Sequence, residues 1–315
     1  MSSTTDSPPQ TPAPGPDPTN SHSPSSGPDI ELRTRRRWPY VAGAAVIVVI
    51  LAAVVAWRFI GSDSPSPNDT AGATLTVVTA EGNASEQALV NFVANQVAPR
   101  YGIKVAFRGL ADSTTLNRAV SDGEVAGTVY QHRLWLSQVL DANPDFKEEA
   151  ATPVFRWGFG IWSDKYASPT DLPQNAKVSL YSDPANEAQG LWLLERAGLI
   201  TLKPGVDKWK ATQDDIATNP RNLQFTLLDF AAQSRALPDL DATVGYTEYY
   251  LAAGIDIAKQ IFAPPAPDEF AGQLTIGSRW KETDNIKKLV AAFKDPAVQQ
   301  YLRTDPKVKN ILLPL

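Results

Sequence analysis

The segment KVSLYSDPANEAQGLWLLERAG, which covers residues 177–198, places a β-strand signal directly before an α-helix signal. Residues 177–181 are typical of a strand, and residues 187–197 are typical of a helix. The chain enters this helix through Ser182-Asp183-Pro184 and leaves it at Gly198, as capping rules predict. A strand followed by a capped helix is the repeating unit of α/β domains.

The same alternation continues on both sides of this segment. Residues 74–79, TLTVVT, form a β-branched run typical of a strand, and residues 85–102 carry apolar side chains near helical spacing. Further strands are predicted at 103–107, 125–130, 155–162, 223–228 and 242–246, and further helices at 114–123, 134–143, 286–293 and 296–302. This order predicts an α/β sandwich with mostly parallel sheets.

The composition disfavours several classes of function. The chain has 315 residues with 29 basic and 34 acidic side chains, a formal charge of −5, so general affinity for nucleic acid is not expected. The absence of cysteine excludes disulfides, thiolate metal sites, cysteine nucleophiles and lipid attachment through cysteine. The two histidines, His22 and His132, are too few for a multi-histidine metal site. We therefore expect no metal and no cofactor.

Residues 1–37 form a polar tail that holds eight of the 26 prolines and almost no large apolar side chains. Such a segment buries too little surface to offset the entropy of ordering, so we predict that it is disordered. Residues 61–73, GSDSPSPNDTAGA, are predicted to form a polar linker. The folded part then spans residues 74–315, a length that often divides into two lobes.

Between the tail and the linker lies WPYVAGAAVIVVILAAVVAW, residues 38–57, which contains no charged side chain. About 20 helical residues match a hydrocarbon core of about 30 Å, and aromatic residues stand at both ends. We therefore predict a transmembrane signal anchor over residues 38–60 in the cell membrane. The arginine-rich sequence before it predicts a cytoplasmic tail and an extracytoplasmic folded part. A buried core helix and a cleaved signal peptide are the alternatives.

Four local motifs occur in order along the folded part. They are Tyr130-Gln131-His132 with Leu136, residues 182–186 (SDPAN) with residues 191–205 (LWLLERAGLITLKPG), residues 219–223 (NPRNL) and residues 249–262 (YYLAAGIDIAKQIF). Together they resemble the methionine-binding lipoprotein family of the NlpA/MetQ type, the substrate-binding subunits of ABC importers. The resemblance covers most of residues 74–315.

The resemblance implies a type-II periplasmic-binding-protein fold, in which two α/β lobes flank an interlobe cleft. Lobe one is expected at residues 74–163 and 247–315, and lobe two at residues 164–246. The ligand is expected in the cleft, at loops that leave the carboxyl ends of strands. Such proteins close like a hinge on the ligand. The implied partners are a small molecule (an amino acid or a related compound), an ABC permease and, through residues 38–60, the lipid bilayer.

Three candidate ligand-binding residues follow from the motifs. His132 comes directly after a strand, and the resemblance implies that it lines the ligand pocket; a structural histidine is the alternative. Trp135 takes the place of the family's tyrosine, with lobe packing as the alternative. Asn186 stands at the start of a helix, whose free N–H groups and dipole suit a carboxylate. The alternative is that Asp183 or Asn186 only caps this helix.

Aromatic residues and a loop of small residues complete the candidate site. Trp157 falls where the family has an aromatic residue facing the cleft, and Tyr246 and Tyr249 stand at the return crossover. Aromatic walls suit a thioether or another apolar side chain. Residues 79–83, after the first strand, permit close approach of a ligand. Ordinary core packing is the alternative for each aromatic residue.

Two positions depart from the family pattern. The family's arginine, which pairs with the ligand's α-carboxylate, aligns with Gln189, and the family's crossover asparagine aligns with about Tyr246. A buried carboxylate without a charged partner is unfavourable, so the predicted ligand widens from methionine to a small, partly apolar organic molecule. Arg156 is a candidate for the missing charge, although strand alternation points it away from Trp157. The family's lipid-bearing cysteine is also absent, and residues 38–60 are expected to replace it.

Catalysis has little support in the sequence. It contains no G-x-S-x-G motif, and no histidine besides His132 lies outside the tail. The sequence therefore predicts a membrane-anchored extracytoplasmic solute-binding protein of an ABC importer, and not an enzyme. The alternative is an anchored extracellular sensor or interaction module whose cleft does not serve transport.

Overall fold

The computed structural model of the protein describes residues 66–315. The expected tail (1–37), the expected anchor (38–60) and the first part of the expected linker (61–65) lie outside the described residues. Within residues 66–315, no helix combines the length and the apolar character that a membrane span needs.

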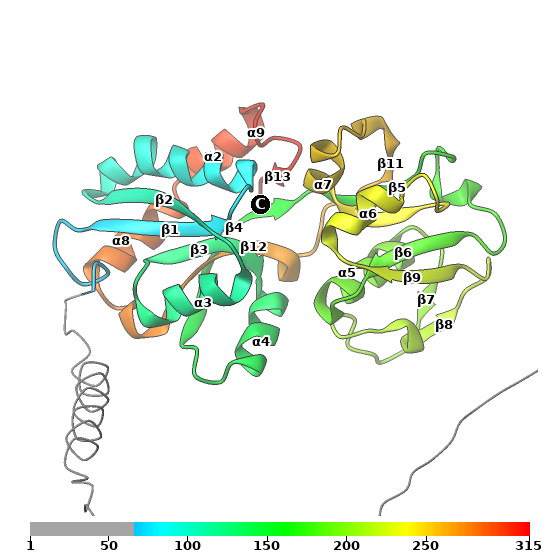
Figure 1. The fold of residues 1–315 in the computed structure, drawn as a ribbon, viewed down its shortest axis with the longest axis horizontal. Coiled ribbons are helices and arrows are strands. Elements are labelled where there is room, and N and C mark those ends of the chain that lie inside the picture. Colours follow the sequence, from blue (N-terminus) through cyan, green and yellow to red (C-terminus); the bar gives the residue numbers. More distant parts are fainter. Residues whose placement is uncertain (1–65) are drawn as a thin grey trace, which may run out of the picture. The chain divides into compact units, whose positions relative to one another are not determined.

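A six-stranded sheet in the order β13-β4-β12-β3-β1-β2 forms the centre of one half of the fold (Figure 1). The strands are β1 (Thr74–Ala80), β2 (Lys104–Leu110), β3 (Gly127–His132), β4 (Glu148–Trp157), β12 (Ala271–Gly277) and β13 (Leu312–Leu313). β1 pairs in parallel with β2 and β3, whereas β12 runs antiparallel to β3 and β4. The prediction of mostly parallel sheets is therefore wrong for this sheet.

The sequence does not reveal the antiparallel strands because their pairing depends on tertiary contact. Residues 271–277, AGQLTIG, lack the β-branched run that marks β1, yet all seven residues of β12 are buried. β12 lies between β3 and β4, so hydrogen bonds on both edges hold a segment of weak intrinsic strand preference.

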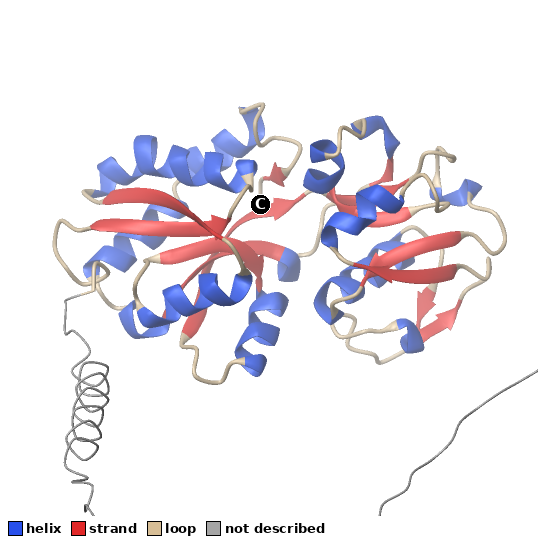
Figure 2. Cartoon of the chain, in the orientation of Figure 1, coloured by secondary structure: helices blue, strands red, loops and turns tan. Residues whose placement is uncertain are grey.

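Helices cover both faces of the six-stranded sheet (Figure 2). One group, which packs together, contains α2 (Ala84–Phe92) with its π and 3₁₀ extension to Tyr101, α8 (Asp284–Phe293) and α9 (Pro296–Thr304). The other group contains α3 (Ser113–Asp122) and α4 (Arg133–Ala142). The neighbouring residues Val77 and Val78 of β1 enter different apolar clusters, as expected for a strand that is covered on both faces.

Residues 159–262 form the other half of the fold around three smaller sheets. One has the antiparallel order β10-β5-β11, formed by β10 (Thr243–Tyr246), β5 (Phe159–Trp162) and β11 (Gln260–Phe262). The others pair β6 (Lys177–Tyr181) with β9 (Gln224–Leu228), in parallel, and β7 (Thr201–Leu202) with β8 (Ile216–Thr218). Helices α5 (Pro184–Arg196), α6 (Phe230–Ala236) and α7 (Thr247–Ala252) complete this half.

The predicted strand and helix of residues 177–198 are confirmed as β6 and α5. The Asp183 carboxylate accepts a hydrogen bond from the Asn186 backbone N–H at 3.0 Å, and Pro184 occupies the first turn, where its missing N–H is harmless. Gly198 adopts a φ of 72°, the left-handed conformation that favours glycine just after a helix.

The chain crosses from one half of the fold to the other at Gly158. β4 ends at Trp157 in the six-stranded sheet, and β5 begins at Phe159 in a smaller sheet. The predicted single strand 155–162 is therefore two strands that belong to different sheets. Between them, the Gly158 N–H donates to the Ile311 carbonyl at 2.7 Å.

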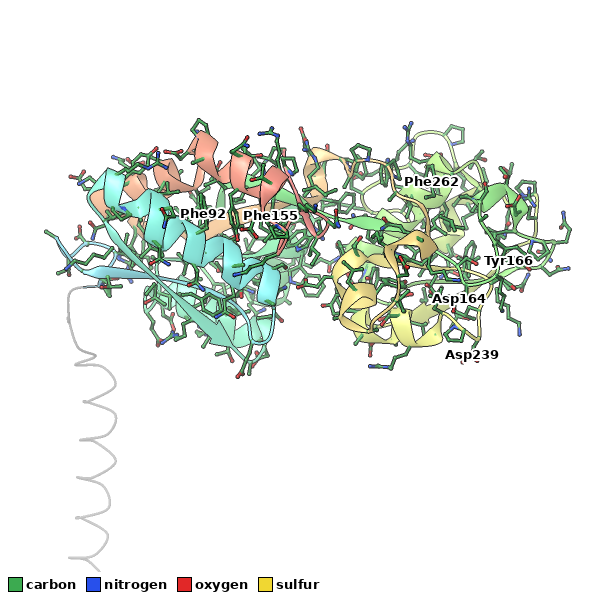
Figure 3. All side chains as sticks on the ribbon, turned by 90° about the horizontal axis from the view of Figure 1, so that it is seen from above. Phe92, Phe155, Asp164, Tyr166, Asp239 and Phe262 are labelled. Atoms are coloured by element: carbon green, nitrogen blue, oxygen red, sulfur yellow. The ribbon has the colours of Figure 1, made fainter. Side chains whose placement is uncertain are left out.

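Strand pairing divides the described residues into two lobes. Lobe one comprises residues 66–157 and 263–315, and lobe two comprises residues 159–262. Figure 3 shows Phe155 and Phe262 on opposite sides of the crossing. These limits differ from the expected limits near 163 and 246, because β5, α7 and β11 pack with the strands of lobe two.

The second half of the expected linker folds onto lobe one. Asn68 is fully buried, and its Nδ2 donates to the Val125 carbonyl at 3.1 Å. Asn285 Nδ2 donates at 2.9 Å to both the Pro67 and the Thr70 carbonyls. Within this segment these contacts use backbone carbonyls and one asparagine, and not apolar side chains. The composition of residues 61–73 therefore predicted a polar linker and gave no sign that its second half packs on lobe one.

We predict that Gly158→Ala destabilises the protein by about 1–3 kcal/mol, the usual range for overpacking. A Cβ atom at this position would lie 2.6 Å from Thr247 Oγ1 and 2.8 Å from the Asn310 carbonyl oxygen. Urea denaturation of the full chain in detergent measures the effect. An unchanged midpoint would show that the crossing tolerates a side chain.

Candidate ligand-binding site

A cavity of about 460 Å³ lies between the two lobes. It is lined from lobe one by the ends of β1 and β3 and the starts of α2, α3 and α4, and from lobe two by the starts of α5, α6 and α7. This is the place where open α/β sheets bind ligands, at the carboxyl ends of parallel strands. The volume suits a small organic molecule.

His132 lies where β3 ends and α4 begins, and its side chain caps α4. Its Nδ1 accepts a hydrogen bond from the Trp135 backbone N–H at 3.1 Å, which assigns the proton of the neutral ring to Nε2. Burial lowers the pKa of His132 to about 4, so the ring is neutral at physiological pH. Nε2 lies 3.3 Å from Asn186 Oδ1 and donates to it across the lobes.

Asn186 connects the two lobes through one amide oxygen. Its Nδ2 donates to Asp183 Oδ1 at 2.8 Å, which fixes the orientation of the amide. Its Oδ1 then accepts from the His132 ring and from the Tyr246 hydroxyl. Asp183 also caps the first turn of α5, so the N–H groups expected to suit a carboxylate already have an acceptor.

Gln189 does not line the cavity, but it contacts a side chain that does. The Tyr246 hydroxyl lies within hydrogen-bond distance of both Gln189 Oε1, at 2.7 Å, and Asn186 Oδ1. A hydroxyl has one proton, so it satisfies one of these two amide oxygens at a time. Gln189 therefore supports the side chains that line the cavity.

Six aromatic rings line the cavity: Tyr130, Trp135, Trp157, Phe230, Tyr246 and Tyr249. Two of the ring contacts join the lobes. Trp135 meets Phe230 with centroids 6.1 Å apart, and Trp157 meets Tyr246 at 5.9 Å. The walls of the cavity are therefore largely aromatic on both sides.

A buried carboxyl group and a half-buried one also face the cavity. Glu86 comes from α2 in lobe one and is 2% exposed; its Oε1 accepts from Trp157 Nε1 at 3.3 Å, and its Oε2 has no hydrogen-bond partner. Glu248 comes from α7 in lobe two and accepts from Ser85 Oγ at 2.9 Å and Asn83 Nδ2 at 3.1 Å. Burial, and then the charge of Glu248, hold the pKa of Glu86 well above its usual range. Burial also raises the pKa of Glu248.

Arg156 is placed outside this cavity. It pairs with Asp268, donates to the Pro314 carbonyl at 3.3 Å and lines a separate hollow. The hypothesis that Arg156 supplies a charge to the ligand is therefore wrong, because strand alternation turns it away from its neighbour Trp157. Among the described residues that line the cavity, none is lysine or arginine.

The structure brings most of the predicted site together. His132, Trp135, Trp157, Asn186, Tyr246 and Tyr249 line one cavity. Sequence reasoning missed Glu86, Glu248, Tyr130 and Phe230. A signal for Glu86 was present, because Asn83 three residues before it caps α2, and that cap stands directly after the first strand.

Metal binding finds no geometric support in the part of the chain that the structure describes. Within residues 66–315, no group of three or more His, Asp or Glu side chains is arranged to hold a metal ion.

The two α/β lobes with an intervening cavity define the class of two-lobed substrate-binding proteins. The family described as NlpA lipoprotein matches residues 75–313, and the chain belongs to this family. The resemblance inferred from the local motifs is thereby confirmed.

Relatives and solved structures agree with this assignment. The methionine-binding lipoprotein MetQ of Bacillus subtilis is 40% identical over 219 residues, which cover 68% of this chain and 78% of that protein. An ABC transporter periplasmic substrate-binding protein from Coxiella burnetii is 30% identical with a TM-score of 0.68, covering 76% of this chain and 100% of that structure. A nutrient-binding protein from Burkholderia cenocepacia, bound to methionine, is 28% identical with a TM-score of 0.64, covering 76% and 98%.

We predict that Glu86→Gln stabilises the protein, and that the gain grows with pH. Below its usual pKa near 4.5, the carboxyl is protonated in both the folded and the unfolded chain. As the pH rises toward the raised pKa of the folded state, only the unfolded chain ionises, so the wild type loses stability that the variant keeps. The glutamine oxygen still accepts from Trp157.

Urea denaturation of both full chains at pH 5 and pH 8 checks this prediction. An equal difference in stability at the two pH values would contradict the account of Glu86 as a buried carboxyl without an adequate partner.

Proposed function

We propose that the protein is the extracytoplasmic substrate-binding subunit of an ABC importer, and that it captures a small, partly apolar organic molecule without altering it. The observation that carries this proposal is the cavity of about 460 Å³ to which both lobes contribute side chains. Aromatic walls favour an apolar portion of the ligand, and a few polar groups fix its orientation.

The contacts between the lobes suggest how capture is coupled to transport. His132 of lobe one meets Asn186 of lobe two, and Ser85 of lobe one donates to Glu248 of lobe two. A ligand held by groups from both lobes favours the closed arrangement, because it contacts all of them only when the lobes are together. A permease that recognises the closed arrangement then receives loaded protein.

Relatives support a small organic ligand for this chain. MetQ of Bacillus subtilis is named for methionine, and the Burkholderia cenocepacia structure is described as bound to methionine. A methionine-like compound is therefore one candidate. Gln189 is neutral and stands where the resemblance places an arginine that pairs with the ligand's carboxylate. The proposed ligand class therefore includes other small molecules with an apolar part.

We further propose that residues 38–60 hold the domain at the outer side of the cell membrane. The support is the uncharged run of residues 38–57 with arginines before it. Because residues 66–73 pack on lobe one, the linker to this anchor would comprise residues 61–65.

We predict that at least one small molecule raises the melting temperature of the full chain in detergent and is recovered chemically unchanged. The panel contains amino acids, dipeptides, sulfur compounds and small amines. A ligand at 100 times its Kd adds about 2.7 kcal/mol of stability. Asn186→Ala is expected to weaken binding about tenfold, because it removes a hydrogen-bonded group that joins the lobes.

Asn219→Ala is the matched control, because Asn219 bonds to the backbone of Leu223 and does not line the cavity. Its Kd for the stabilising compound should equal that of the wild type. If no compound in the panel shifts the melting temperature, the transport proposal fails and a sensor or interaction module becomes the better interpretation.

A further inference from the structure

We propose that the cavity selects a small organic cation, an amine or quaternary ammonium compound without a carboxylate, and holds its charge beside Glu86 and Glu248. This inference rests on the proposed function and specifies the class of substrate. It follows from the charges, the unpartnered oxygen and the aromatic rings of the cavity.

The charged groups of the cavity have one sign. Glu86 is buried, Glu248 is half-buried and Asp112 is exposed, whereas no lysine or arginine is found among the described residues that line the cavity. His132 is neutral, because burial lowers its pKa to about 4. A ligand carboxylate would therefore enter a buried site without a cationic partner, which is strongly unfavourable.

The helix N-termini at the cavity do not replace such a partner. Asn83 caps α2 by accepting from the Glu86 N–H at 3.0 Å, His132 caps α4, and Asp183 caps α5. These first-turn N–H groups already have side-chain acceptors. These three caps thus use donors that a bound carboxylate would need.

The hydrogen bonding of the Glu86 carboxyl group is incomplete in the described structure. Its Oε1 accepts one weak hydrogen bond, from Trp157, and its Oε2 is buried without a partner. Glu248 approaches from the other lobe and disfavours ionisation of Glu86 by its charge. A cation between the two carboxylates would offset the cost of keeping their charges away from water and the repulsion between them. It would therefore favour the arrangement in which the lobes are joined.

The aromatic rings suit the same ligand. Trp157 donates to Glu86 and also lines the cavity, so an aromatic ring and a carboxylate converge on one point. Aromatic faces attract cations, and rings around a cavity are the known means of recognising quaternary ammonium groups. Trp135, Tyr130, Phe230, Tyr246 and Tyr249 supply the remaining rings.

Binding of a cation should release protons. The other titratable groups that face Glu86 across the cavity are Asp112, Tyr130, His132, Tyr246, Tyr249 and Glu248. Burial raises the pKa of the tyrosines and lowers that of His132, so these groups stay neutral. A cation lowers the raised pKa of the two glutamates, and the protons they lose pass to the buffer.

The test uses matched ligands on the full chain in detergent. L-Methionine and L-methioninol share a side chain and an ammonium group, but methioninol carries a hydroxymethyl group in place of the carboxylate. Glycine betaine and choline form a second pair with a quaternary ammonium group. Titration calorimetry in two buffers of different ionisation enthalpy gives the Kd and the number of protons released.

We expect a cation of at least one pair to bind about tenfold or more tightly than its carboxylate analogue, with proton release. Glu86→Gln should weaken this binding about tenfold or more while it raises the melting temperature, a combination that misfolding cannot produce. Glu148→Gln is the matched control, because Glu148 is a second buried carboxyl without a partner and does not line the cavity.

Two results would overturn the inference in different ways. If the carboxylate analogues bind as tightly as the cations and Glu86→Gln leaves the Kd unchanged, the cation assignment fails while the proposed function stands. If neither these compounds nor any other small molecule binds, both fail. Loss of binding in Glu148→Gln would also contradict the assignment, because the effect on binding would then not be specific to Glu86.

Discussion

The cost of ionising two carboxyl groups at one cavity, one on each lobe, is the constraint on which the candidate site depends, because burial opposes the ionisation of both and the charge of Glu248 opposes that of Glu86. Glu86 lies in the first turn of α2 in lobe one and Glu248 in the first turn of α7 in lobe two, and both face one cavity. The hydrogen bonds from the His132 ring to the Asn186 amide oxygen, and from Ser85 and Asn83 to Glu248, join the lobes around these two carboxyl groups. Because ionisation of Glu86 is unfavourable while the lobes are joined, a ligand that changes this cost can shift the equilibrium between joined and separated lobes.

Local structure and the family were predictable from the sequence, and the pairing of distant segments was not. Residues 177–198 carry their strand, cap and helix in one stretch, and β6 and α5 form there. β12 has no such local signal, because its place is set by β3 and β4 on its two edges. Gly158 shows the same limit: residues 155–162, FRWGFGIW, predict one continuous strand, yet hydrogen bonds to distant residues divide them between two sheets.

The site was predicted where a motif or an aromatic side chain marked it. His132 and Asn186 lie in the motifs, and the structure places them 3.3 Å apart across the lobes. Glu86 and Glu248 were missed because a glutamate in the first turn of a helix is an ordinary surface residue, and only the fold buries it. Arg156 was considered because it neighbours Trp157 in sequence, although adjacent residues of a strand face opposite sides. The chain belongs to the NlpA lipoprotein family, and the residues that the local motifs marked line the cavity between the lobes.

The distance between the lobes tests the central claim that they close on a small molecule. The chain has no cysteine, so Ser137→Cys on α4 and Arg196→Cys at the end of α5, both exposed positions, introduce two unique sites for spin labels. Electron–electron double resonance would measure the distance distribution with and without the compound that most raises the melting temperature. The account predicts a shorter and narrower distribution with ligand. An unchanged distribution at saturating ligand would contradict it.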